Sequence, residues 1–270
     1  MTMLPSFPCR LLPAFLLLAS VPAWAAKPIF NVTDYGARND GSASATEAIR
    51  AAIQAAKAAG GGTVFFPEGT YVTGPIELAS NLVLDIGAGA TLKFPATRLP
   101  YAPGRVQGIE CLQPVPLIGG DHLENVTITG RGVITTDNAE WVRLMGGPTP
   151  KSATGAGSPF GQAWNDLLAA LQVQTPQPES VYLKVAPLLR PDTIRVMNSR
   201  NVLIEKIRVL GASFWTMHLL YSDNVTIRNV SLETYPGIFT GGIYIDSSRN
   251  VRISDSYLDN GDDAITLKAG

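Results

Sequence analysis

The sequence predicts an all-β protein, a right-handed parallel β-helix with an N-terminal capping α-helix. A motif of asparagine followed by alternating apolar residues begins at Asn201, Asn224 and Asn250, at spacings of 23 and 26 residues. Between these motifs lie short strand-like segments and polar turns, with no room for a crossover helix. Each repeat therefore forms one coil, and successive coils stack about 4.8 Å apart.

Residues 1–25 are typical of a secretory signal peptide. Arg10 precedes an apolar run, and small residues ending at Ala25 supply a cleavage site. The run is too short to remain as a membrane span. We expect a secreted or periplasmic protein without membrane contact after cleavage, with the β-helix domain over residues 26–270.

Composition and charge exclude several classes of function. The chain has 21 Lys and Arg against 22 Asp and Glu, so nothing suggests a basic nucleic-acid surface. After cleavage only Cys111 remains, and no disulfide can form within the chain. An exported protein of this kind must bury a real core, for which the length is ample. We expect a monomer with no nucleic-acid partner.

The N-terminal part contains one obvious helix. Ile49 and Ile53 form an apolar stripe with the intervening alanines, and glycines 60–62 end the helix. The segment 63–74, "TVFFPEGTYVTG", then predicts strands. The helix would cap the first coil, whose edge strands would otherwise be exposed. Residues 146–180 break the repeat, and we interpret them as a loop excursion around a short helical piece, "AWNDLLAALQ".

Strand alternation predicts which side chains leave the core. In "GIYIDS", Ile243 and Ile245 face inward, whereas Tyr244 and Asp246 face outward. The neighbouring coils place Trp215, Met217, Leu219, Ile265 and Leu267 inward, and Thr216, His218, Ala264, Thr266 and Lys268 outward. The outward residues should form one solvent-facing ladder. Each alone is more often structural, but together they suit a carbohydrate that carries carboxylates, with His218, Tyr244, Lys268 and Thr216 as substrate-binding candidates.

Asp262 and Asp263 stand side by side after a glycine turn, beside the predicted ladder. Adjacent carboxylates repel, so a sequence keeps such a pair for a metal, for acid/base chemistry, or by the accident of a polar turn. These three interpretations remain open from the residues alone.

Two long segments resemble glycoside hydrolase family 28, the polygalacturonases. They are "RPDTIRVMNSRNVLIEKIRVLGASFWTMHLLYSDNVTIRNVSL" and "GGIYIDSSRNVRISDSYLDNGDDAITLKAG". The opening, "FNVTDYGARNDGSASATEAIRAAIQAAKAAGGGTVFFPEGTYVTGPI", is similar to a wider group of pectin-degrading β-helix proteins. The resemblance implies inverting hydrolysis of a pectic polysaccharide or oligogalacturonide, with no metal and no cofactor. It implies that Asp262 is the general acid and that Asp263 helps to activate water.

The chain departs from the family pattern in two ways. Where the resemblance implies Asn-Thr-Asp-Gly, residues 239–242 are Phe-Thr-Gly-Gly, so the third catalytic acid is replaced by Gly241. Asp246 is the remaining candidate for the base. The family also continues for several coils with Gly-His-Gly and Arg-Ile-Lys motifs, and we therefore expect the sequence to be an N-terminal fragment.

Two other functions compete with hydrolysis. A non-catalytic carbohydrate-binding β-helix is favoured by Gly241, and in that case replacing Gly241 by Asp should raise activity. A lyase would use Ca²⁺ held by Asp262, Asp263 and Asp246, and its products would absorb in the ultraviolet.

Overall fold

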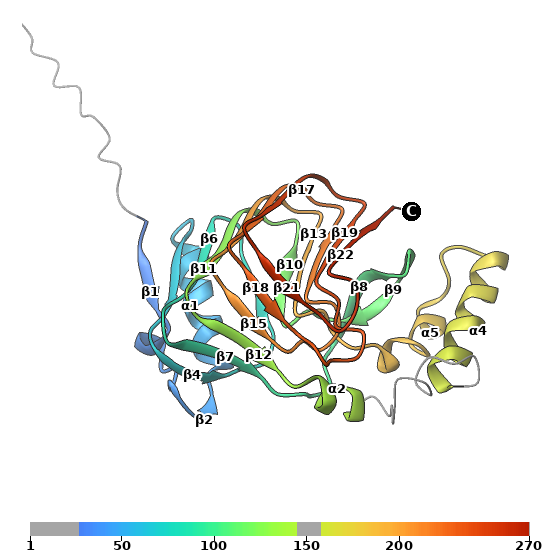
Figure 1. Ribbon diagram of the computed structural model, residues 1–270, viewed down its shortest axis with the longest axis horizontal. Helices are drawn as coiled ribbons and strands as arrows, with labels where there is room; N and C mark the ends of the chain where they lie inside the picture. Colours follow the sequence, from blue (N-terminus) through green and yellow to red (C-terminus); the bar gives the residue numbers. More distant parts are fainter. Residues whose placement is uncertain (1–26, 145–157, 270) are drawn as a thin grey trace, which may run out of the picture.

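The computed structural model describes residues 27–144 and 158–269. Its chain passes through three parallel sheets in turn, so that each complete coil adds one strand to each sheet (Figure 1). This arrangement confirms the predicted parallel β-helix. The expected signal peptide, residues 1–25, lies outside the described ranges.

The three sheets are named A, B and C, and their strands are given in hydrogen-bonding order. Sheet A contains β1 (Ile29–Asn31), β3 (Gly62–Phe66), β6 (Leu82–Ile86), β11 (Glu124–Gly130), β14 (Arg200–Glu205), β17 (Asp223–Arg228) and β20 (Arg249–Ser254). Sheet B contains β2 (Asp40–Ser44), β4 (Gly69–Val72), β7 (Ala90–Phe94), β12 (Val133–Thr136), β15 (Arg208–Leu210), β18 (Ser231–Glu233) and β21 (Tyr257–Asp259). Sheet C contains β5 (Ile76–Glu77), β10 (Ile118–Asp121), β13 (Ile194–Met197), β16 (Met217–Leu220), β19 (Ile243–Asp246) and β22 (Ile265–Lys268).

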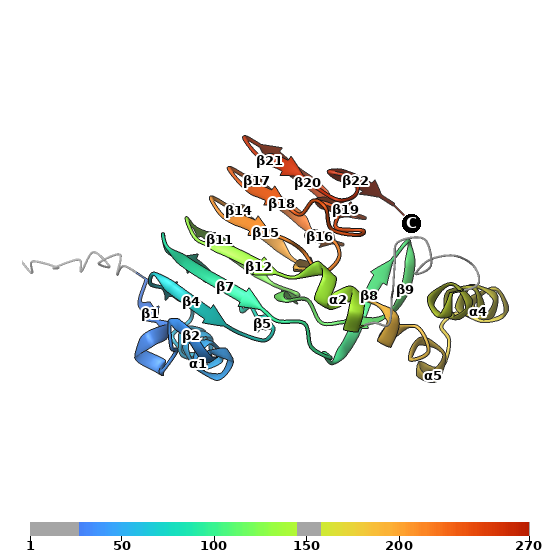
Figure 2. The same cartoon turned by 60° about the horizontal axis from the view of Figure 1, so that its bottom comes forward.

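The predicted capping helix is α1 (Thr46–Ala58). It lies across the first coil, against β1, β3 and β5, at the opposite end of the stack from β22 (Figure 2). Its buried stripe contains Ile49, Ala52, Ile53 and Ala56. A short 3₁₀ helix, η1 (Val32–Tyr35), connects β1 to β2 beside it. None of the helices in the described ranges is long and apolar enough to cross a membrane.

An asparagine ladder explains the repeat seen in the sequence. Asn81, Asn125, Asn201, Asn224 and Asn250 all have positive φ, between 54° and 61°, at the entrance to a sheet A strand. The amide of Asn125 donates to Asn81 (2.9 Å), that of Asn201 to Asn125 (3.0 Å) and that of Asn224 to Asn201 (2.9 Å). Asparagine tolerates the left-handed conformation and can bond to its copies in neighbouring coils. The motif therefore recurs because this turn recurs.

Two insertions extend from the same corner of the β-helix, in the connections from a sheet B strand to a sheet C strand. The first is an antiparallel hairpin of β8 (Tyr101–Val106) and β9 (Ile109–Pro114), which lies between β7 and β10 in the chain. The second lies between β12 and β13 and contains α2 (Asn138–Leu144), α4 (Pro159–Val173), α5 (Glu179–Tyr182) and a 3₁₀ helix, η2 (Ala186–Leu188). The described part of the predicted 146–180 excursion is therefore largely helical.

These insertions form a second apolar cluster beside sheet C. Val106 and Cys111 of the hairpin, Leu167 of α4 and Val185 after α5 are buried there. The main core lies inside the coils and includes Met217, Leu219 and Ile243, as predicted. Of the other residues expected to face inward, Ile265 and Leu267 on β22 are 48% and 77% exposed.

Candidate active site

The outward-facing residues of sheet C form the predicted ladder. Successive strands β13, β16, β19 and β22 pair in register, and one row of partners is Arg195, His218, Tyr244 and Thr266. Asp246 and Lys268 pair with each other two residues further along. Alternation thus placed His218, Tyr244, Asp246, Thr266 and Lys268 on one face correctly.

The prediction that this ladder faces solvent is wrong for four residues. Thr216, His218, Tyr244 and Asp246 are each at most 3% exposed. Arg105 of the β8–β9 hairpin reaches Asp246, and the apolar cluster of the insertions packs against Tyr244. Lys268 is half-buried, whereas Asp262 and Asp263 are exposed.

Trp215 is also misplaced by the sequence prediction. It is buried, as expected, but it belongs to the second cluster beside sheet C and not to the core within the coils. Its ring stacks on both Phe214 (4.9 Å between centroids) and Tyr244 (4.1 Å). Trp215 precedes β16, so strand alternation does not apply to it.

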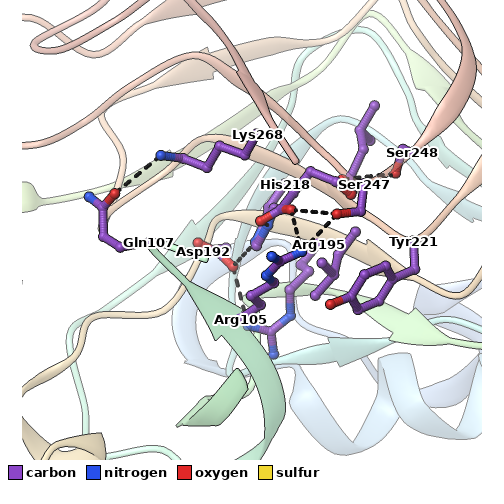
Figure 3. Close-up of polar contacts among 12 residues, drawn as sticks. Arg105, Gln107, Asp192, Arg195, His218, Tyr221, Ser247, Ser248 and Lys268 are labelled. Atoms are coloured by element: carbon purple, nitrogen blue, oxygen red, sulfur yellow. Dashed lines mark hydrogen bonds and ion pairs between the residues drawn. The ribbon is translucent and has the colours of Figure 1, made fainter. Parts of the chain in front are cut away.

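Asp246 takes part in a buried ion pair with Arg105 that joins the hairpin to sheet C. Figure 3 shows Arg105 near Ser247, the residue that follows Asp246. The Arg105 guanidinium donates to Asp246 Oδ1 at 3.0 Å and to Ser247 Oγ at 2.7 Å. Burial would raise the pKa of Asp246, but His218 and Arg105 more than offset it, and the pKa is lowered. In this arrangement the carboxylate is ionised and covered, so a role as base would require the hairpin to move.

His218 lies between two buried carboxylates. Its Nδ1 is 3.0 Å from Asp192 Oδ2, and its Nε2 is 3.7 Å from Asp246 Oδ2. Burial would lower the pKa of the imidazole, but the Asp192 carboxylate, and then Asp246, raise it overall. The charged form of His218 is therefore favoured, and it bridges sheet C to the loop that precedes β13.

Three polar residues around His218 were missed from the sequence. Asp192 Oδ2 accepts from Arg195 Nη1 at 3.2 Å, and both side chains are buried. A signal for Arg195 existed, because it lies 23 residues before His218, the spacing of one coil. Arg105 gave no such signal, because the hairpin lies outside the repeat.

Asp262 and Asp263 form an exposed turn immediately before β22. The Asp263 amide donates to Asp262 Oδ1 at 2.9 Å, and the Gly242 amide donates to the Asp263 carbonyl at 2.9 Å. Thr266 Oγ1 donates to Asp263 Oδ2 at 3.4 Å. Burial, and then the charges of Asp262 and Asp263, raise the pKa of Tyr244, which places this phenol near both acids.

The Ca²⁺ site considered from the sequence is not assembled here. Within residues 27–144 and 158–269, no three His, Cys, Asp or Glu side chains gather in a way that could hold a metal ion. Asp246 is buried and pairs with Arg105 and His218, whereas Asp262 and Asp263 are exposed. The acids of the turn and the buried cluster are thus two separate groups.

Family models match both ends of the described chain. Residues 29–98 match the family described as rhamnogalacturonase A/epimerase, pectate lyase-like. Residues 181–270 match glycosyl hydrolases family 28, and this segment contains the ladder and the Asp262–Asp263 turn.

Individual relatives extend the similarity to most of the chain. An exo-poly-alpha-D-galacturonosidase from Dickeya chrysanthemi is 26% identical over 263 residues, which are 91% of this chain and 43% of that protein. The structure of an exopolygalacturonase from Thermotoga maritima is 32% identical, with a TM-score of 0.80 over 90% of this chain and 55% of its own. A family 28 exopolygalacturonase from Yersinia enterocolitica is 25% identical, with a TM-score of 0.66 over 90% and 45%.

The chain thus spans about half the length of these relatives. The matched family segment, the relatives and the stacked parallel sheets agree with one another. The segment 181–270 belongs to glycoside hydrolase family 28, and the chain is polygalacturonase-like over most of its length.

Proposed function

We propose that the protein is an exported hydrolase that removes galacturonate units from the end of a pectic polysaccharide or oligogalacturonide. The observation that carries this proposal is the exposed Asp262–Asp263 turn on the outer face of sheet C, within the segment that matches family 28. The pattern of residues 1–25 supports export.

Asp262 would donate a proton to the glycosidic oxygen as the bond to the leaving sugar breaks. A second carboxylate would take a proton from water as it attacks the anomeric carbon from the opposite face, which inverts the configuration. Gly241 offers no carboxylate, and Asp246 is paired with Arg105 beneath the hairpin. The role of base therefore falls to Asp263.

Lys268 would bind the carboxylate of the substrate. Its ammonium donates to Gln107 Oε1 at 3.2 Å, and an ammonium has three donors. The two insertions stand beside this site, at one corner of the coils. Insertions in this position support action at the end of a polysaccharide chain, as do the names of the Dickeya, Thermotoga and Yersinia relatives.

The test is Asp262→Asn in the whole protein, assayed for new reducing ends on polygalacturonate. We expect a loss of at least ~100-fold in kcat, the usual contribution of a positioned acid. Circular dichroism should be unchanged, because the side chain is exposed. Asp255→Asn is the matched control, since Asp255 is an exposed turn residue of the same coil and its positive φ suits asparagine. Full activity in Asp262→Asn would contradict the proposal.

A non-catalytic carbohydrate-binding protein is the second candidate, and Gly241 favours it. Calorimetry with trigalacturonate, combined with the reducing-end assay, separates the two. Binding without any product over a long incubation would select the binding protein. A lyase would instead produce an ultraviolet absorbance that EDTA abolishes.

A further inference from the structure

The ring of Tyr244 occupies the space that a side chain at position 241 would need. A Cβ at position 241 would lie 2.7 Å from Tyr244 Cζ, and closer still to its hydroxyl oxygen. The φ of Gly241 is outside the left-handed region, so the backbone itself would accept alanine or aspartate. The three heavy atoms nearest to such a Cβ all belong to the Tyr244 side chain, which therefore excludes a side chain at this position.

The Tyr244 ring is fixed by its neighbours. It stacks on Trp215 with 4.1 Å between centroids and 14° between planes, and it is 3% exposed. Trp215 in turn stacks on Phe214 and meets the edge of His218 at 5.0 Å. Because Trp215 stacks on Phe214 as well as on Tyr244, the Tyr244 ring cannot yield to a new side chain without disturbing the stack.

The same ring also holds a cation. Lys268 Nζ lies 5.5 Å from the centroid of Tyr244 and 5.3 Å from that of Trp215, within the range of a cation–π contact. Gln107 at the hairpin tip accepts one hydrogen bond from this ammonium. Two rings and one amide thus fix the position of the charge.

We propose that Tyr244 is a positioning residue, whose ring excludes a side chain at Gly241 and holds the Lys268 ammonium in place for a carboxylate of the substrate. The second part rests on the proposed function, because it assigns Lys268 to an acidic sugar. The first part concerns packing and stands without it. We therefore expect that Gly241→Asp would raise activity only together with a smaller residue at position 244, and not alone.

The packing part is tested by a double-mutant cycle on thermal stability. Gly241→Ala should lower the Tm clearly in the wild-type background and much less in Tyr244→Ala, where the space is free. Gly74→Ala is the control, because a Cβ there meets Thr46 at an ordinary 3.5 Å. Equal losses in both backgrounds would overturn this part. If Tyr244→Ala fails to fold, Tyr244→Leu replaces it in the cycle.

The Lys268 part is tested by comparing Tyr244→Leu with Tyr244→Phe. Phenylalanine keeps a ring beneath the ammonium and leucine does not. On polygalacturonate we expect Tyr244→Leu to raise KM about tenfold with a smaller change in kcat, and Tyr244→Phe to keep the wild-type KM. On fully methyl-esterified substrate, neither change should alter KM. Equal effects of Leu and Phe, or equal effects on both substrates, would overturn this part.

Failure of the proposed function would look different. A wild-type protein that hydrolyses neither substrate would refute the hydrolase, and the role of Tyr244 would then be measured by calorimetry with digalacturonate. Weaker binding in Tyr244→Leu and unchanged binding in Tyr244→Phe would support the positioning role. The same affinity in all three proteins would reject it.

Discussion

Replacing Asp246 by asparagine should destabilise the protein strongly, although the two side chains have almost the same shape. Asp246 is fully buried and faces the Arg105 guanidinium at 3.0 Å and His218 at 3.7 Å. The change therefore removes the buried counter-ion of a guanidinium whose side chain is 5% exposed, and leaves it only the exposed Glu110 carboxylate at 3.7 Å. Removing one partner of a buried pair costs about 3–5 kcal/mol in the free energy of unfolding.

A loss of this size is measurable by urea unfolding. Tryptophan fluorescence is a suitable probe, because Trp215 lies in the cluster beside the pair. For a domain of this size each kcal/mol shifts the Tm by roughly 2–4 °C, so the Tm should fall by roughly 6–20 °C. The midpoint in urea should fall while the m-value is unchanged.

Glu124→Gln is the matched control for this prediction. It breaks the Arg200–Glu124 pair, which is shorter, at 2.7 Å, but has side chains that are 62% and 47% exposed. Water solvates both partners there, so the midpoint should move little. If Asp246→Asn were as mild as this control, the hairpin would not exclude water from the pair, and the reasoning would be refuted.

Three further outcomes are expected. The raised pKa of His218 adds stability that is complete below its unfolded pKa, about 6.5, and is lost as pH rises through the folded pKa. The Tm of the wild type minus that of His218→Gln should therefore shrink from pH 5.5 to 9. A constant difference would argue against a charged His218. Burial raises the pKa of the Cys111 thiol to about 12, so in a Cys9→Ser background iodoacetamide at pH 8 should label the unfolded protein and spare the native one, whereas rapid native labelling would contradict the burial. Asn201→Ala should lower the free energy of unfolding by about 1–3 kcal/mol. Asn201→Gly should lower it by less, because glycine accepts the φ of 56°. The reverse order of the two variants in urea titrations would contradict the role of the asparagine ladder.

The coils were predictable from the sequence because their turns repeat. Asn201, Asn224 and Asn250 mark a left-handed turn that each coil needs, and their spacing gave both the register and the number of residues per coil. Alternation then assigned His218 and Tyr244 to one face, since strands in register place equivalent residues in a row. These features are local or periodic, and a single sequence contains them.

The surroundings of the site were not predictable, because they depend on the insertions. Nothing near Arg105 in the sequence indicates that it will meet Asp246, since the hairpin lies outside the repeat. Arg105 covers Asp246, and Asp192 and Trp215 contact His218, so the exposure of both residues was predicted wrongly. Asp262 and Asp263 were placed correctly at a turn beside the ladder. Nothing in the local sequence, however, indicates that the Tyr244 ring fills the space beside Gly241.

The β8–β9 hairpin also sets an order of events during synthesis. Its two strands pair with each other locally, but the partner of Arg105 lies 141 residues later and that of Gln107 lies 161 residues later. At about 5–20 residues per second, the ribosome adds Asp246 roughly 7–30 s after Arg105. During that interval the arginine remains in water, and the hairpin has no coil of sheet C to cover at that level. The β8–β9 hairpin is thus synthesised early and docks late, after the β19 coil has formed.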